Sequence, residues 1–554
     1  MKANAFSDIA WIRTTAGLVT PKEALSRCHE PGFSLDMSLP GFEISAQFRF
    51  LLSVTALLVR EEFGRAPSLG QTQSLLQNGF SSAVVEKVNQ NLVSHLNVLD
   101  GLQPFMGRPR LHPEGPKDAS RRIGPGDQEV KKLSPAMPSE QGEDYWNLLV
   151  EFPDSLSISE ATLKIVTYHY FSMAGNNKFD GDKTRMGAPG IRFPGKGYAA
   201  TEHIWIREGS SLLRSLLTSL PTSWVKGEGL PAWADRTAQK SRTGQQQFHA
   251  LWEATWSSNT AVSYWEDGYL TGVRVGGIPP AWWPDIPNTK EGEKALKLWW
   301  DQRNEKDPLY FYLKNKKGEP KAQRIDFGRD GIDLAVEWAA EAKMMDLVEK
   351  TYKNVLPVDS YPTVDGDDEG IDKYQLVFFR HQVEGTASSP SIRASEVFLA
   401  DRSVWAFDLS CDEQLRLRDN AQLVRDVYIT LLGVFRRKSA ADASREVATG
   451  WGAAVLDSLA VSQSDASDAY WRGVTDVYQK YLADLRVGEE ITEELYRGIR
   501  SAALEAYDEV TAPYLAQYAN EIYYVRASLV RSVNSKINTA RDEGIGRIKE
   551  ESNE

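Results

Sequence analysis

The last third of the chain constrains the fold most, because from Asp412 onward its apolar residues recur almost throughout with helical spacing. Pro513 interrupts this pattern once, since proline ends or breaks a helix. Amphipathic helices joined by short connections pack as antiparallel bundles, so we predict an all-α, four-helix-type bundle over residues 409–554. The apolar stripes are Val424, Val427, Leu431 and Phe435; Val447, Trp451, Val455 and Leu459; Leu495, Ile499, Ala502, Ala506 and Val510; and Ile522, Val525, Leu529 and Val533.

The preceding residues 1–408 mix helix and strand signals, and we expect a large α+β domain of irregular topology. Ile9–Arg13 and Leu18–Thr20 are typical of the two strands of a hairpin, and Pro21 then begins a helix with Thr20 as its N-cap. Glu43–Phe63 has a wide apolar face, which predicts a mostly buried helix. Further expected elements are helices at 84–98, 159–170, 210–220 and 333–348, strands at 202–206 and 374–379, and a hairpin formed by 309–313 and 323–327.

Charge and composition exclude several classes of protein. The 554-residue chain has a net charge of -12. Its two cysteines, Cys28 and Cys411, lie far apart in the sequence, and this excludes a disulfide framework and a CxxC zinc site. The N-terminus lacks the apolar core of a signal peptide, and the longest apolar run, Phe48–Val59, is too short to span a bilayer. HExxH, Walker A and G-x-S-x-G motifs are absent from the sequence. We expect a cytoplasmic protein without a cofactor, a metal or a membrane contact.

A glycine-rich basic segment, Lys183–Thr201, reverses the local sign of charge in this acidic chain, because it contains no acid. Glycine lets a backbone approach a ligand closely, and basic side chains beside it suit phosphate contacts. The alternative is an ordinary surface loop between two elements, and the residues alone favour that alternative. The glycines are Gly187, Gly190, Gly195 and Gly197, and the cations are Lys183, Arg185, Arg192 and Lys196.

Two further loops and a tryptophan-rich region are also candidate functional features. Residues 107–155 are expected to form a mobile loop, since most of this stretch is polar, proline-rich and without helical period. His381–Pro390 is expected to form a second loop, after the strand at 374–379. Residues 221–304 contain nine tryptophans, which suit either a buried core or a surface that stacks on sugars.

The order of these pieces resembles CasA, the family of large subunits of the type I-E CRISPR Cascade complex. The likeness covers nearly the whole chain, and its specific feature is the order of the motifs, since each motif alone is weak. The motifs are Asp8–Ile12 near the start, SLPGFEISAQFRFLLSVTALLV across the apolar helix, LQPFM at 102–106, Ser391–Arg393 before Val404 and Trp405, and Thr511–Tyr514 in the bundle.

This resemblance implies a non-enzymatic subunit that recognises the protospacer-adjacent motif (PAM) in double-stranded DNA, helps to unwind the duplex and recruits a helicase–nuclease. The implied partners are target DNA, the CRISPR RNA-containing Cascade backbone and its small subunits. Residues 1–408 would be the PAM-recognition domain, and the bundle would contact the small subunit and the displaced strand. Such a division, in which protein reads a short duplex motif and base pairing reads the rest, is general in RNA-guided recognition.

The resemblance also implies DNA-binding residues in three places. The family's glycine loop corresponds to 187–191 and its wedge loop to 381–390. Its mobile early loop, which carries an aromatic–Asn feature, corresponds to about 130–155 within the stretch 107–155. Phosphate-binding cations are expected beside the glycine loop, and a glutamine or threonine at the wedge. The residues expected to bind nucleic acid are Gly187, Gly190, Arg192, Gly195, Lys196, Trp146, Asn147, Gln382 and Thr386.

Two other functions remain open at this point. An aromatic-rich carbohydrate-active or ligand-binding protein would use the tryptophans as a stacking surface, which a glycan screen would test. A protein-only interaction scaffold would dock its basic loops on an acidic partner. A steep loss of duplex affinity with salt would favour DNA binding over the scaffold.

Overall fold

The chain divides into two compact units. Unit 1 comprises Met1–Phe327 and Glu349–Leu399, and unit 2 comprises Gly328–Val348 and Ala400–Glu554. The sequence predicted a single boundary near residue 408. Residues 328–348 precede that boundary but belong to unit 2. The computed structural model describes residues 3–109, 127–136, 153–172, 197–198, 200–207, 209–244, 247–282, 307–310, 312–314, 320–324, 331–344, 355–356, 358, 374–386, 389–401, 403–407, 409–435, 462–489 and 492–551.

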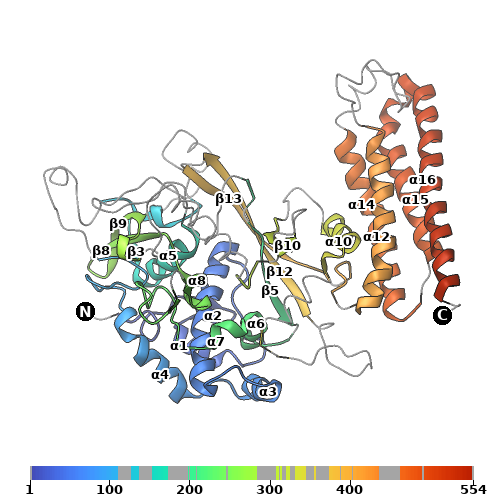
Figure 1. Ribbon diagram of the computed structural model, residues 1–554. Helices are drawn as coiled ribbons and strands as arrows, with labels where there is room; N and C mark the ends of the chain where they lie inside the picture. The colour runs from blue at the N-terminus through green and yellow to red at the C-terminus, as the bar shows by residue number, and fades with distance from the viewer. Residues whose placement is uncertain are drawn as a thin grey trace. The chain divides into compact units, whose positions relative to one another are not determined.

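Unit 1 is built around helix α2, Gly41–Phe63, which the apolar pattern predicted as a mostly buried helix (Figure 1). Every residue from Gly41 to Val59 is buried, and this confirms the prediction. Gly64 ends the helix with a left-handed φ of 64°, and its N–H donates to the Arg60 carbonyl at 2.8 Å. Among the described residues, α2 is the one helix long and apolar enough to cross a membrane, but its apolar window is wholly buried inside the protein.

Shorter helices surround α2. Helix α1 begins as predicted, because Thr20 Oγ1 accepts the N–H of Glu23 at 3.1 Å. The sequence pattern does not predict α3, since Thr72 and Leu75 are its only buried residues and its apolar stripe is correspondingly weak. The helices described in unit 1 besides α2 are α1 (Pro21–Arg27), α3 (Leu69–Asn78), α4 (Ser82–Leu92), α5 (Ile158–Phe171), α6 (Leu212–Ser219), α7 (Thr222–Val225) and α8 (Ala250–Thr255), with single 3-10 turns η1 (Val93–His95), η2 (Val130–Leu133) and η4 (Pro280–Trp282).

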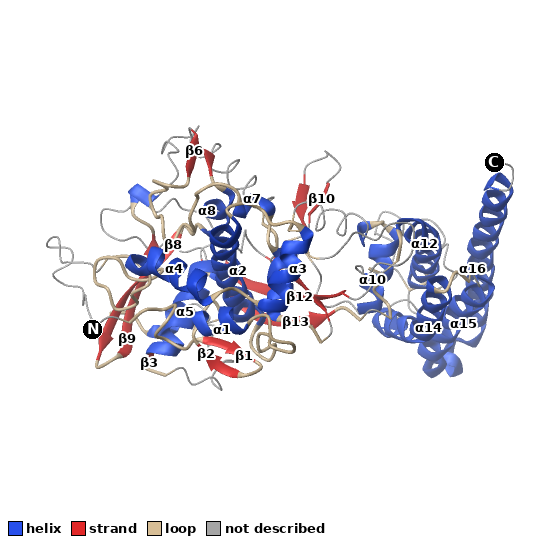
Figure 2. Ribbon diagram, turned by 90° about the horizontal axis from the view of Figure 1, so that it is seen from below, coloured by secondary structure: helices blue, strands red, loops and turns tan. Residues whose placement is uncertain are grey.

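The described strands of unit 1 pair antiparallel in small sheets. The order β13-β12-β4, with β5 also paired to β12, makes a four-stranded sheet, and β3-β9-β8 makes a three-stranded one. Figure 2 shows β8 and β9 on one side of α2 and the β12–β13 pair on the other. The strands are β1 (Ile12–Thr14), β2 (Gly17–Val19), β3 (Leu156–Ser157), β4 (Gly197–Tyr198), β5 (Glu202–Arg207), β6 (Arg242–Gly244), β7 (Gln247–Phe248), β8 (Asn259–Glu266), β9 (Tyr269–Gly277), β10 (Tyr312–Lys314), β11 (Pro320–Ala322), β12 (Tyr374–Thr386) and β13 (Ser389–Leu399).

Tryptophans fill the core of unit 1. Trp224, Trp233, Trp252 and Trp256 are each at most 2% exposed, so their rings are not available as a stacking surface. Burial of rings of this size contributes strongly to the stability of the core. Trp283, Trp299 and Trp300 lie outside the described residues.

Unit 2 is helical, as the periodicity predicted. Figure 1 shows α12, α14, α15 and α16 running alongside one another, and the stripe residues Val424, Ile499 and Val525 are fully buried. The predicted bundle is therefore confirmed, while the stripe at 447–459 lies outside the described residues. The described helices are α10 (Gly331–Ala340), α12 (Cys411–Gly433), α14 (Ser462–Arg486), α15 (Thr492–Thr511) and α16 (Leu515–Glu551), with the 3-10 turn η7 (Ala512–Tyr514) at Pro513.

Helix α10 packs on the bundle although it precedes β12 in sequence. Arg425 Nη1 on α12 donates to Glu341 Oε1 at 2.7 Å, just beyond the end of α10. The ring of Trp338 meets that of Trp405 edge-on, with 5.6 Å between centroids. These contacts explain why 328–348 belongs with unit 2.

Candidate nucleic-acid interface

The prediction that His381–Pro390 forms a loop is wrong, because these residues belong to a long β-hairpin. Strand β12 has 13 residues and β13 has 11, and their pairing continues to Thr386 opposite Ser389. The polar composition of the stretch is typical of a loop, but in an antiparallel ribbon the backbone groups pair whatever the side chains are. The candidate wedge is therefore an extended two-stranded ribbon, in which Thr386 and Ser389 form the last residue pair.

A β-bulge lies close to the end of this hairpin. Gln382 pairs with Ala394 and Val383 pairs with Ile392, so Arg393 is the extra residue on β13. The Arg393 side chain is exposed. Bulges increase the local twist of a ribbon and change the direction of a side chain. The sequence offers no signal for a bulge here, so Arg393 is not among the residues predicted from the sequence to bind DNA.

The glycine-rich segment ends beside the hairpin. Gly197 and Tyr198, near its end, form β4, in which Tyr198 pairs with Gln382 and Gly197 pairs with Val383. In sequence, Gly195 and Lys196 directly precede β4. The structure thus brings the end of this segment to the bulge. Of the residues predicted to bind DNA, Gly187, Gly190, Arg192, Gly195, Lys196, Trp146 and Asn147 lie outside the described residues.

Part of the expected mobile loop 107–155 is packed against unit 1. Gln128 and Val273 on β9 exchange two backbone hydrogen bonds, of 3.0 and 2.9 Å. Asp127 Oδ2 lies 2.7 Å from Arg274 Nε in a largely buried ion pair, and Leu133 is fully buried in the core. Residues 127–136 are therefore an ordered anchor within the long polar stretch.

The same anchor reaches the hairpin from the side opposite β4. The N–H of Ile392 on β13 donates to the carbonyl of Pro135 at 2.9 Å. Val383 pairs with Ile392 on one side and with Gly197 on the other. The two segments that the sequence associates with DNA, 107–155 and Lys183–Thr201, therefore each contact the hairpin around its bulge, through Pro135 and Gly197.

Buried charges hold the base of the hairpin sheet against α2. Arg49 on α2 donates through Nε to Glu202 Oε1 on β5 at 2.9 Å and through Nη1 to Asp307 at 2.9 and 3.0 Å. The three side chains are at most 3% exposed. Burial alone would lower the pKa of Arg49, but the two carboxylates outweigh it and raise that pKa above its usual value. The cluster keeps β5 in place beside β12.

A second polar chain joins the N-terminal end of α2 to the hairpin. His381 Nδ1 lies 2.9 Å from Ser395 Oγ, and His381 Nε2 lies 3.8 Å from Glu202 Oε2. This order of groups is that of a serine nucleophile, a base and an acid. Ser395 Oγ, however, accepts the N–H of Phe42 at 3.1 Å, and a Cβ on Gly41 would lie 3.1 Å from it. Ser395 is therefore packed closely against the backbone of α2, and the chain of groups has a structural role.

Outside the hairpin, the described histidines and acids offer no candidate catalytic or metal-binding cluster like that of His381. His169, near the end of α5, is buried, and its Nε2 lies 2.8 Å from the Thr255 carbonyl. In the described part of the chain, no group of three or more His, Cys, Asp or Glu side chains is arranged to hold a metal ion.

Comparisons with known proteins agree with this architecture. The solved structure of Thermus thermophilus CasA (Cse1) is similar with a TM-score of 0.59 and 15% identity, over 97% of this chain and 100% of that chain. Thermobifida fusca Cse1 is similar with a TM-score of 0.61 and 13% identity, over 97% and 98% of the two chains. A chain of a CRISPR RNA-guided surveillance complex gives a TM-score of 0.63 and 14% identity, over 96% and 99%. At these identities the likeness shows the fold.

Sequence comparison gives the family. No curated protein matches the chain by sequence. The family model described as CRISPR-associated protein Cse1 matches residues 9–329, which is more than half of the chain. This match confirms the resemblance to CasA, because the Thermus thermophilus structure carries both names. The chain belongs to the CRISPR-associated protein Cse1 family.

Proposed function

We propose that this protein is the non-catalytic large subunit of an RNA-guided CRISPR interference complex. In this role it recognises the PAM in double-stranded DNA, helps to unwind the duplex and recruits a helicase–nuclease. Its fold is similar to that of a chain in a CRISPR RNA-guided surveillance complex, which supports placing it beside a CRISPR RNA-containing backbone and small subunits.

The observation that carries the proposal is the meeting of three segments at the hairpin bulge. Val383 pairs with Gly197 at the end of the glycine-rich segment, and its partner Ile392 bonds to Pro135 in the anchor of the early loop. A surface that recognises a short motif in duplex DNA and opens the duplex needs three parts. These are backbone that can enter a groove, cations that bind phosphates and an element that enters the base stack. We assign the backbone and the cations to the glycine-rich segment and the inserted element to the hairpin.

Each segment has its own task in the proposed interface. Gly187 and Gly190 let the backbone enter the minor groove, which is narrow and carries a degenerate code. Arg192, Lys196 and the bulge residue Arg393 bind phosphates, which fixes position without reading sequence. Gly195 gives the chain close approach before β4. Trp146 and Asn147 add contacts from the early loop.

The hairpin is the proposed wedge. Thr386 lies at its paired end, while Gln382 lies at the bulge beside β4. We assign Thr386 to the step that separates the bases and Gln382 to the contact beside the glycine-rich segment. Inserting a side chain between base steps costs about a few kcal/mol of stacking per step, which further protein–DNA contacts must offset.

The test is binding of short duplexes by the protein assembled on its guide-RNA complex, with the flanking trinucleotide varied at fixed salt. One flank should bind best, and Gly190→Asp should abolish this preference because a carboxylate then faces the groove. Lys196→Ala should weaken all flanks alike and reduce the salt slope by about 1. Lys240→Ala, which removes an exposed lysine from another part of unit 1, is the matched control.

Unwinding is tested separately with a fluorescent base analogue placed next to the flank. Substituting Thr386 should slow or reduce the opening signal while leaving the choice of flank intact. If no flank is preferred, and omitting the subunit changes neither binding nor opening, the proposal is wrong and a protein-only scaffold becomes the better explanation.

A further inference from the structure

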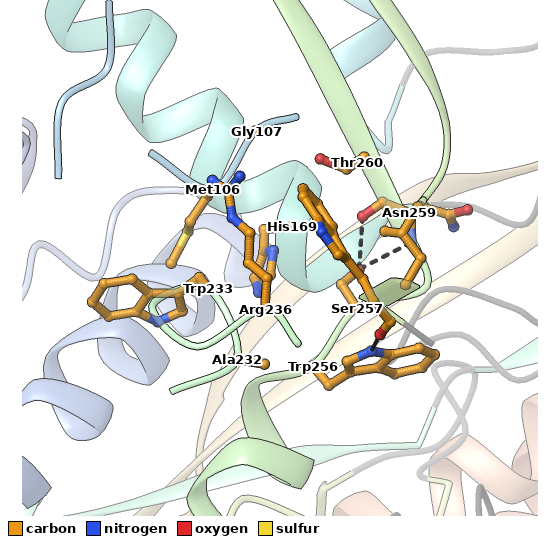
Figure 3. Close-up of a pocket in the computed structure, with 12 residues that line it drawn as sticks. Met106, Gly107, His169, Ala232, Trp233, Arg236, Trp256, Ser257, Asn259 and Thr260 are labelled. Carbon is orange, nitrogen blue, oxygen red and sulfur yellow. Dashed lines mark hydrogen bonds between the residues drawn. The ribbon is translucent and has the colours of Figure 1, made fainter. Parts of the chain in front are cut away.

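A small cavity lies on unit 1, between the end of α5, the chain before β6 and the start of β8. Its volume is about 30 Å³. By the same measure a single water needs about 10–15 Å³, so the cavity accommodates two waters or a group of similar size. Figure 3 shows its lining, in which Trp233 and Trp256 contribute aromatic walls and Arg236 and Thr260 contribute polar groups.

Arg236 is the unusual feature of this cavity. Its Nη2 donates to the carbonyl of Pro104, and its guanidinium lies over the ring of Trp282, 4.6 Å from the centroid. Among the described residues no carboxylate forms an ion pair with it. Burial lowers the pKa of Arg236 to about 10, and the charge of Asp100 opposes this only in part. A partly buried cation with one carbonyl partner has hydrogen-bonding capacity left over.

Comparison with Arg60 makes this clear. Arg60 is also partly buried without a carboxylate partner, but it donates to three backbone carbonyls, those of Trp224, Val225 and Gly229. A guanidinium carries five N–H donors on three nitrogens. In Arg60 each of the three nitrogens donates one hydrogen bond to a carbonyl. In Arg236 only Nη2 has such a bond among the described residues.

Two further donors of the cavity lining lack partners. Thr260 is 3% exposed and Trp233 is 2% exposed, and neither Thr260 Oγ1 nor Trp233 Nε1 has a hydrogen-bond partner among the described residues. In Figure 3 the Thr260 hydroxyl points from β8 toward the side of the cavity where Arg236 lies. Buried polar groups of this kind are rare in proteins, since each costs free energy unless it is bonded.

We propose that this cavity binds the carboxylate group of a ligand, with Arg236 as its counter-ion and Thr260 as a neutral donor. A carboxylate offers only acceptors, which matches a lining whose unused polar groups can all donate. It is planar and pairs well with guanidinium. Two oxygens and their carbon also fit the volume, whereas a tetrahedral phosphate is larger. The site is distinct from the hairpin and does not depend on the proposed function in DNA recognition.

The test is ligand-observed NMR with the full chain, using saturation transfer to the methylene and methyl protons of propionate. Propionamide, which has the same shape without the charge, is the neutral control, and inorganic phosphate competes as a second anion at constant ionic strength. Propionate should bind saturably and propionamide should not. Phosphate displacing propionate at equal or lower concentration would overturn the assignment to a carboxylate.

Substitutions of the lining residues test whether propionate binds in this cavity. Arg236→Gln should weaken propionate binding by about tenfold or more, since it removes a charged hydrogen bond. Thr260→Val keeps the shape of the side chain and should weaken binding several-fold without unfolding the protein. Arg65→Gln removes an exposed arginine and should change nothing. Unaltered binding in both Arg236→Gln and Thr260→Val overturns the proposal.

A capped tripeptide with a central glutamate distinguishes two sources of the carboxylate. Tighter binding than propionate, lost in Arg236→Gln, assigns the site to an acidic side chain of a partner protein. Weaker binding than propionate, with the same dependence on Arg236, assigns it to a small molecule.

Discussion

Ile392 on β13 donates its backbone N–H to the carbonyl of Pro135, at 2.9 Å, although more than half of unit 1 separates the two residues in sequence. The bond joins the hairpin to the packed anchor 127–136 of the long polar stretch. The anchor and the hairpin are therefore in direct contact beside the bulge.

The ion pair between Asp127 and Arg274 should hold this anchor in place. Asp127→Ala leaves a largely buried guanidinium without its carboxylate, which should destabilise the local structure by about 3 kcal/mol. Amide hydrogen exchange at Gln128 and Val273 should become faster, and proteolysis within 127–136 should increase. Asp154→Ala, at an exposed aspartate, is the control. Unchanged exchange at Gln128 would show that the buried apolar residues alone anchor the segment.

The buried cluster of Arg49, Glu202 and Asp307 should make Arg49 essential for the stability of unit 1. Arg49→Met leaves two buried carboxylates without a counter-ion and should lower the free energy of unfolding by about 3–5 kcal/mol. Replacing the carboxylates as well, with Glu202→Gln and Asp307→Asn, should recover part of the loss. Denaturant unfolding measures both effects; equal stability of the single and triple variants would contradict the cluster's role.

His249 should give unit 1 a pH-dependent term in its stability. Its Nδ1 accepts the N–H of Leu251 at 3.2 Å and its Nε2 lies 2.6 Å from the Lys226 carbonyl, so the ring is neutral. Burial lowers the pKa of His249 below the usual histidine value of 6.5 and outweighs the hydrogen bond to the Lys226 carbonyl, which acts in the opposite direction. Because the unfolded chain takes up the proton first, stability is lost as pH falls below about 6.5 toward the folded pKa.

His249→Asn tests this term, since asparagine is a good N-cap that does not titrate. Denaturant unfolding from about pH 8 to about pH 5 should show a shallower loss of stability in the variant than in the parent. Identical pH profiles would exclude His249 as the source.

Gly498 should be required for close packing of α14 and α15. A Cβ on Gly498 would lie 2.4 Å from Val477 Cγ1, so Gly498→Ala should force the helices apart and cost about 1–3 kcal/mol. Gly433→Ala is the matched control, because a Cβ there meets nothing within 4 Å and should be neutral or stabilising by up to about 1 kcal/mol. Thermal unfolding of the two variants compares them directly; a stabilising effect of Gly498→Ala would contradict the packing.

Local sequence determined much of this protein. The apolar run of α2 predicts its burial, the Thr20–Pro21 pair predicts the start of α1, and the helical stripes predict the bundle. These features depend on residues a few positions apart, which physical chemistry links directly. The sequence also carries a local signal for the turn between β8 and β9. Asp267 and Gly268 form the Asp-Gly dipeptide that favours two-residue hairpin turns, and their φ values are 49° and 83°.

Tertiary structure alone decided the candidate interface. The polar stretch after Phe379 is a strand because β13 and β4 pair with it, and no local pattern reveals those partners. The meeting of Gly197, Val383 and Ile392, like the attachment of α10 to unit 2, depends on contacts between residues far apart in the chain. Strand pairing uses backbone groups that every residue carries, so the choice of partner is made by the packing of the whole unit rather than by local sequence.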